Sequence, residues 1–175
     1  MIVKKNAVAF GLVMVMGAPL LAGGPGNDRD KRLEARLNGY EENPTLSTPG
    51  RGLFTAKITR DNEIEYELKY WNLETEITQS HIHFGRPHVN GGIAAWLCGT
   101  PTNPGPADNP PPQCELGTSG SVKGVITADS VIGPAGQGIA PGEFAELLSA
   151  IRSDATYANV HTTGRPGGEI RGLIR

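Results

Sequence analysis

Four histidines are the residues of this chain whose type and spacing could do chemistry. His81 and His83 stand two positions apart in a strand-like run, so their side chains share a face with about 7 Å between Cα atoms. His88 follows after a Gly-Arg-Pro turn, and His161 lies in a later strand-like run. Imidazole is the commonest metal ligand, and an all-imidazole set favours Zn or Cu over Ca or Mg. The pattern therefore predicts a Cu or Zn site of His81, His83 and His161, which His88 could join.

The same histidines also fit a structural role. If Ile82 faces the core, His81 and His83 face solvent or another layer of the protein. They could equally be buried neutral rings whose nitrogens bond to backbone carbonyls. His161 can complete a common site only if its strand lies near the first. A metal-binding module and an interaction module with structural histidines are thus both open hypotheses.

Three further residues are candidates to orient an imidazole. Asn159 shares a strand face with His161, and Glu169 and Arg171 share a face beyond the turn that follows His161. A carboxylate can hold a metal-bound imidazole through its free N–H. The alternative is an ordinary cross-strand ion pair, worth at most about 1 kcal/mol when exposed, and the sequence favours that alternative.

Cys98 and Cys114 are the two cysteines and enclose a proline-rich loop. Residues 99–113 contain six Pro and two Gly, a composition that cannot hold a sheet or helix. In an oxidising compartment such a pair forms a disulfide, and closing a loop of this size stabilises the fold by about 3 kcal/mol. Two thiolate metal ligands are the alternative. We expect the disulfide, because the first 22 residues indicate export.

The first 22 residues have the layout of a secretory signal peptide. Lys4 and Lys5 precede an apolar run over 7–21, and Ala22-Gly23 offers a small-residue cleavage site. An uncleaved membrane anchor is the alternative, but the run is short for a span of about 20 residues. We therefore expect cleavage, a flexible lead-in over 23–31 and a periplasmic or extracellular protein with no membrane attachment.

The remaining chain predicts one β-rich domain over 32–175. Its 24 Gly and 14 Pro among 175 residues are nearly double average usage and favour short strands with many turns. A net charge of −2 argues against a nucleic-acid partner. Apolar residues alternate in runs such as 64–70, whereas Phe144, Leu147, Leu148 and Ile151 have helical spacing. About seven strands and a short helix near 142–152 predict an antiparallel β-sandwich or Greek-key barrel.

Several motifs in order resemble the CHRD domain, named after chordin. The segments 37–44 (LNGYEENP) and 81–85 (HIHFG) are similar to its opening and central signatures, and 157–162 (YANVHT) and 166–172 (PGGEIRG) to its close. The resemblance covers roughly 32–175. It implies an extracellular β-rich module with an unidentified extracellular protein partner, and it places His81, His83 and His161 on motif positions. The proline-rich loop departs from the family's short connection and suggests local bracing.

A fainter resemblance is to copper/zinc superoxide dismutase, another exported Greek-key protein with a His-X-His pair and a later strand histidine. Four histidines could at most build the copper half, and no Asp is placed to complete a bridged zinc site. The sequence contains no GxSxG or HExxH motif, and the paired acids Glu41 and Glu42 beside Pro44 fit a solvated loop. We therefore expect a non-catalytic binding module, with a copper oxidoreductase as the weaker alternative.

Overall fold

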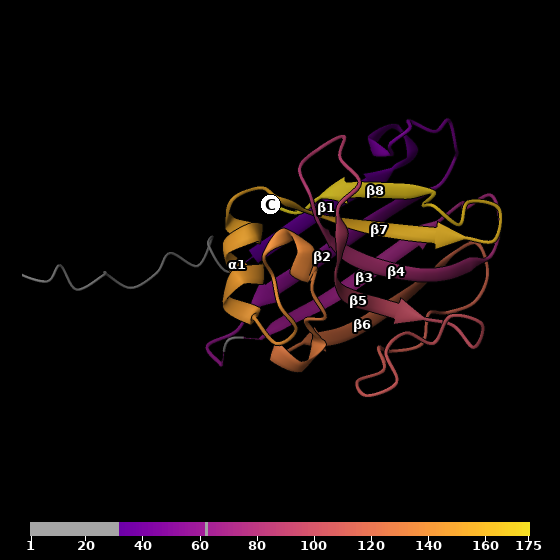
Figure 1. Cartoon of the computed structure of the whole chain (residues 1–175). Helices are drawn as coiled ribbons and strands as arrows, with labels where there is room; N and C mark the ends of the chain where they lie inside the picture. Colours follow the sequence, from indigo (N-terminus) through magenta and orange to yellow (C-terminus); the bar gives the residue numbers. More distant parts are fainter. Residues whose placement is uncertain (1–31, 62) are drawn as a thin grey trace, which may run out of the picture.

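In the part of the chain that the structure describes, eight antiparallel strands curl into one nearly closed barrel (Figure 1). The computed structural model describes residues 32–61 and 63–175, so the predicted signal peptide and lead-in lie outside the described residues. The sheet order is β5-β4-β7-β8-β1-β2-β3-β6. The strands are β1 (Arg32–Asn38), β2 (Arg51–Ile58), β3 (Ile64–Trp71), β4 (Ile77–Phe84), β5 (Gly92–Gly99), β6 (Gly120–Ile126), β7 (Thr156–Thr162) and β8 (Ile170–Leu173). The predicted mostly-β class is confirmed.

Side-chain alternation explains why these segments form the barrel wall. In β3 every second residue is buried, beginning with Ile64, Tyr66 and Leu68, while the residues between them face outward. β1 alternates in the same way and pairs with β2 along its whole length. Because a strand turns successive side chains to opposite faces, this pattern places one face of each strand in the apolar core.

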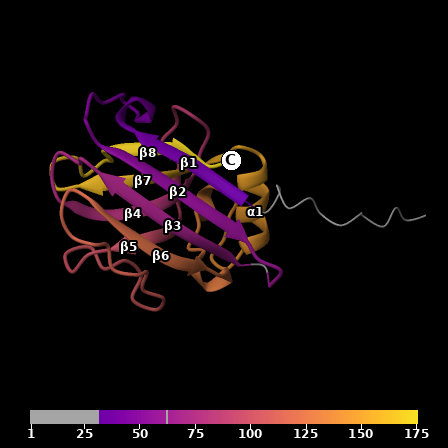
Figure 2. The ribbon, with the colours of Figure 1, turned by 180° about the vertical axis from the view of Figure 1, so that it is seen from behind.

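The barrel has two halves that differ in what their outer faces carry. β1, β2, β3 and β6 form the half seen in Figure 2, and their outward residues include charged side chains such as Glu67 and Lys69. β5, β4, β7 and β8 form the half that faces the viewer in Figure 1. This second half carries His81, His83 and His161.

The two halves meet at a seam between β5 and β6, which are not paired by ladder hydrogen bonds among the described residues. Tyr66 of β3 reaches over this seam and donates its hydroxyl to the Leu97 carbonyl of β5 at 2.5 Å. Gly124, its register partner in β6, makes room for the ring, since a Cβ there would lie 2.4 Å from the Tyr66 hydroxyl oxygen. Tyr66 therefore links the two edge strands.

An α-helix, α1 (Phe144–Arg152), covers an end of the barrel (Figure 1). It begins two residues later than the predicted segment, because Pro141 and Gly142 form the preceding turn. The four residues predicted from the helical spacing are all buried. In the part of the chain that the structure describes, no helix is long and apolar enough to cross a membrane.

The predicted disulfide between Cys98 and Cys114 is confirmed, with 5.0 Å between the two Cα atoms. Next to it the chain is also held by backbone hydrogen bonds, from Cys114 N–H to the Gly99 carbonyl at 2.8 Å and from Gly99 N–H to the Pro112 carbonyl at 3.1 Å. The proline-rich loop is therefore fastened to the end of β5 at both of its ends.

We predict that Tyr66→Phe lowers the free energy of unfolding by about 1–3 kcal/mol, because the Leu97 carbonyl loses its buried donor. Urea unfolding measures this change. Tyr40→Phe is the matched control: Tyr40 is 59% exposed, so its variant should stay within about 0.5 kcal/mol of the wild type. Equal unfolding midpoints for Tyr66→Phe and the wild type would contradict the role of Tyr66 at the seam.

Candidate metal centre

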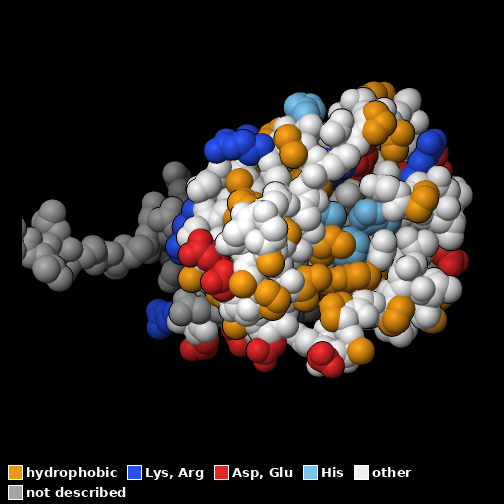
Figure 3. All heavy atoms as spheres, viewed as in Figure 1, with side chains coloured by type: hydrophobic (Ala, Val, Ile, Leu, Met, Phe, Trp, Pro, Cys, Tyr) orange, Lys and Arg blue, Asp and Glu red, His pale blue; other side chains and the backbone are white. Residues whose placement is uncertain are grey.

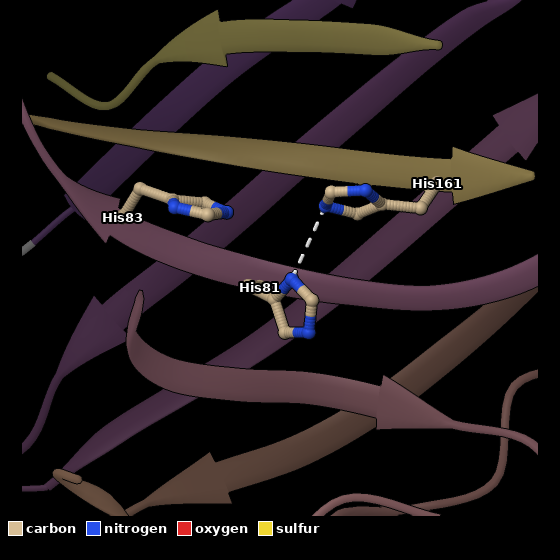
Figure 4. Close-up of side chains that lie close together, drawn as sticks. All are labelled: His81, His83 and His161. Carbon is tan, nitrogen blue, oxygen red and sulfur yellow. Dashed lines mark hydrogen bonds between the residues drawn. The ribbon is translucent and has the colours of Figure 1, made fainter. Parts of the chain in front are cut away.

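Three of the four histidines come together on two neighbouring strands. His81 and His83 project from β4, and His161 projects from β7, which pairs with β4 in the antiparallel sense. The register sets Gln79 opposite His161 and Asn159 opposite His81, so all three imidazoles leave the same face of the sheet. One nitrogen from each ring lies within 4.8 Å of the others (Figure 4). The sequence hypothesis required this adjacency of strands.

The histidines lie on the outer face of the barrel and are nevertheless buried. Ile82 is fully buried in the core, so its neighbours His81 and His83 point the other way. His81, His83 and His161 are only 1%, 8% and 6% exposed. Figure 3 shows histidine side chains in a hollow of this face. The site is thus sheltered from solvent but reachable from it.

Two backbone carbonyls fix the orientation of two imidazoles. His83 donates from Nδ1 to the Gly91 carbonyl at 2.9 Å, and His161 donates from Nδ1 to the Pro166 carbonyl at 2.9 Å. A carbonyl can only accept, so each neutral ring carries its proton on Nδ1 and its lone pair on Nε2. A metal-binding imidazole typically donates its other N–H to a backbone carbonyl in this way.

The third imidazole completes a group at ligand spacing. His81 Nδ1 lies 3.2 Å from His161 Nε2. A tetrahedral ion with Zn–N bonds of 2.0–2.1 Å separates its ligand nitrogens by about 3.4 Å. The Nε2 atoms of His81 and His83 are buried and have no hydrogen-bond partner among the described residues. The group therefore contains buried nitrogens that protein atoms leave unsatisfied.

Burial keeps the three rings neutral. Desolvation lowers the pKa of His81 to about 2, and the neighbouring His161 and His83 add to the shift. Desolvation lowers the pKa of His83 to about 4 despite the opposing hydrogen bond to Gly91, and it also lowers the pKa of His161. A neutral imidazole has a free lone pair, which is the form that binds a metal ion.

A buried ion pair lies beside the histidines. Arg171 donates from Nε to Glu42 Oε2 at 2.7 Å, and Asn159 donates from its side-chain amide to Glu42 Oε1 at 2.6 Å. Burial raises the pKa of Glu42, while the charge and hydrogen bond of Arg171 oppose that shift. Glu42 is therefore not the solvated loop acid that its position beside Pro44 suggests.

Arg171 affects the imidazoles through a loop. Its guanidinium donates to the Val89 carbonyl at 3.3 Å and to Asn90 Oδ1 at 3.0 Å. The next residue, Gly91, supplies the carbonyl that orients His83. Arg171 thus holds the loop whose Gly91 carbonyl orients His83.

Tyr157 supports the same ring and was not identified from the sequence. Its ring is parallel to that of His83, with 4.9 Å between centroids, and the Arg171 guanidinium lies 4.4 Å from the centroid of Tyr157. The Tyr157 hydroxyl also accepts the Gly91 N–H at 3.1 Å. The available signals were its place in the 157–162 motif and its position two residues before Asn159 on one strand face.

Two of the predicted site residues, Glu169 and His88, lie apart from the imidazoles. The Glu169 carboxylate accepts hydrogen bonds from the Thr48 and Thr162 hydroxyls and from the Glu74 N–H, and Arg171 pairs with Glu42 instead of Glu169. The orienting role for which Glu169 was a candidate is filled by the carbonyls of Gly91 and Pro166. His88 lies on an exposed loop in a left-handed conformation and is outside the three-histidine group.

The lowered pKa values predict a pH-dependent stability of the metal-free protein. Unfolded histidines take up protons as the pH falls through about 6.5, whereas folded His83 does so only near 4, so the unfolded state gains protons first. The free energy of unfolding should fall between these values by up to about 1.4 kcal/mol per pH unit for each histidine.

Urea unfolding at several pH values from 7.5 to 5 measures this slope. We expect a shallower slope for His83→Gln and a wild-type slope for the exposed control His88→Gln. Parallel pH profiles for the wild type and His83→Gln would contradict the neutral, buried state of His83.

The comparisons with known proteins agree with the motifs in the sequence. The family model of the CHRD domain matches residues 33–174, which is most of the chain and includes all three clustered histidines. Comparison with curated proteins and with solved structures gives no match. Because the family model covers well over half of the sequence, the chain belongs to the CHRD domain family.

Proposed function

We propose that this protein is an exported CHRD-domain binding module that holds a copper or zinc ion through His81, His83 and His161. The observation that carries the proposal is the buried Nε2 atom of His83, which has no partner among the described residues and lies in one group with the His81 and His161 rings, whose facing nitrogens are 3.2 Å apart. A buried polar atom without a hydrogen bond costs about 1–3 kcal/mol. An ion bound by the lone pair of His83 Nε2 would remove that cost.

The ligand set supports copper or zinc over other metals. Three neutral imidazoles suit these two ions, whereas Ca and Mg prefer oxygen ligands. Three protein ligands also leave a fourth position for water or a small ligand. The hollow in Figure 3 supports access of such a ligand from solvent.

The competing hypothesis, an interaction module with structural histidines, accounts for less of the geometry. In a structural cluster we expect every buried nitrogen to have a partner. The carbonyls of Gly91 and Pro166 satisfy only the Nδ1 atoms of His83 and His161. The metal hypothesis also gives a role to the Nε2 atom of His83, which these carbonyls leave unsatisfied.

Export is part of the proposal. The disulfide supports an oxidising compartment, since such bonds are rare in reducing ones. CHRD domains are typically extracellular. We therefore propose that residues 1–22 direct export and are removed, and that the mature protein is periplasmic or extracellular.

Calorimetric titration of the metal-stripped protein with Cu(II) and with Zn(II) tests the metal site. We expect a Kd below about 1 μM for at least one ion, equivalent to about −8.2 kcal/mol. His83→Ala and His161→Ala should each weaken binding by about 100-fold or more, or roughly 2.7 kcal/mol, because each removes one of three ligands.

His88→Ala is the matched control, because it removes an imidazole outside the group. Its affinity should equal that of the wild type, and far-UV circular dichroism checks that all variants are folded. The proposal fails if the wild type gives no binding heat, or if folded His83→Ala and His161→Ala bind as tightly as the control.

A further inference from the structure

The metal-free cluster fixes the proton of His81 on one nitrogen. His161 carries its own proton on Nδ1, toward the Pro166 carbonyl, so His161 Nε2 is an acceptor. His81 Nδ1, which lies 3.2 Å from it, must then be the donor. The Nε2 atom of His81 is left with a buried lone pair that has no partner among the described residues.

Metal binding requires the opposite arrangement. Nδ1 is the His81 nitrogen that faces His161 (Figure 4), so it is the atom that would bind an ion shared with His161. A neutral imidazole that binds metal through Nδ1 carries its proton on Nε2. One proton therefore leaves Nδ1 and one is taken up at Nε2, with no net release.

We infer that Trp96 is a positioning residue that stabilises the metal-binding tautomer of His81; this inference rests on the proposed function. Trp96 is the register partner of His81 on β5. The two rings stand edge to face, with 4.3 Å between centroids and 86° between planes. In Figure 4 the second nitrogen of His81 is turned toward β5.

The charge distribution of the indole ring determines which tautomer of His81 it stabilises. The face of an aromatic ring is negative, so it attracts an N–H and repels a lone pair. In the metal-free tautomer the edge of His81 toward β5 carries a lone pair, and in the metal-bound tautomer it carries an N–H. Trp96 therefore favours the second tautomer over the first.

The disulfide loop packs against Trp96. Gly105 has a left-handed φ of +80°, and a Cβ there would lie 3.1 Å from Trp96 Cε3 and 2.7 Å from Pro111 Cδ. The loop backbone thus packs closely on the indole. Cys98 and Cys114 fasten this loop to the strand that carries Trp96. The proline-rich loop therefore supports the indole ring that lies beside His81.

The affinity test compares Zn(II) binding by Trp96→Leu and Trp96→Phe. Leu keeps an apolar side chain but removes the aromatic face, so we expect its Kd to rise about 5-fold, the upper range for an N–H to ring contact. Phe retains an aromatic face and should restore most of the affinity. Trp71→Leu, on β3, is the control and should bind like the wild type.

The spectroscopic test follows the tautomer itself by ¹⁵N NMR of protein with labelled histidine, with the His81 signals assigned by their loss in His81→Gln. We expect the His81 proton on Nδ1 in the metal-free protein and on Nε2 after Zn(II) is added. If Trp96 only supports the fold, the His81 proton should occupy the same nitrogens in Trp96→Leu as in Trp96→Phe.

The outcomes separate the two proposals. No Zn(II) or Cu(II) binding by the wild type overturns the proposed function, and this inference with it. Metal binding by the wild type, combined with unchanged affinity of folded Trp96→Leu or with a His81 proton already on Nε2 without metal, overturns the inference alone.

Discussion

β4 and β7 pair from Phe84 opposite Thr156 to Ile77 opposite Thr162, and this register determines both the core and the site. On the inner face it brings Ile82 beside Ala158 and places Val160 in the core. On the outer face it brings His81 within 3.2 Å of His161, which lies 80 residues further along the chain. Because side chains alternate with a period of two, a slip by one residue would send the imidazoles inward and the apolar residues outward. The apolar core therefore fixes the register that assembles the histidines.

The outer face of this half of the barrel is a second buried layer, made of polar groups. Its members satisfy one another across long sequence separations: Arg171 and Glu42 are 129 residues apart, and Asn159 and Glu42 are 117 apart. Removing either partner of the Arg171–Glu42 pair leaves a buried charge alone, which is far more costly than losing an exposed pair. The network thus ties β7, β8 and the loops over the site into one unit, and the Gly91 carbonyl keeps its position relative to His83.

The sequence predicted the features that depend on local patterns. Alternating apolar residues identified the strands, helical spacing identified α1, and the cysteine pair identified the disulfide. His81 and His83 were recognisable because two residues on one strand face need no tertiary information. Glu42 and Tyr157 were not recognisable as site residues, because their roles depend on contacts with Arg171 and Gly91, far away in the chain. Glu169 was a candidate to orient an imidazole or to pair with Arg171 across the strands, but the Thr48 and Thr162 hydroxyls, which no local pattern places, donate to its carboxylate.

The ion pair also controls the charge that a bound cation would meet. Three neutral imidazoles bring no negative charge to a divalent ion, and Arg171 by itself would repel that ion. The effect of Arg171 is visible in the histidines, since its charge contributes to the lowered pKa values of His83 and His161. Glu42 lies against Arg171 with 2.7 Å between Oε2 and Nε, so the pair has no net charge. Coulomb interactions weaken slowly with distance in a buried region, and a neutral pair therefore acts on the site much less than a lone guanidinium would. Glu42 allows the fold to use Arg171 as the anchor of the loop beside His83 without placing an uncompensated positive charge next to the imidazoles.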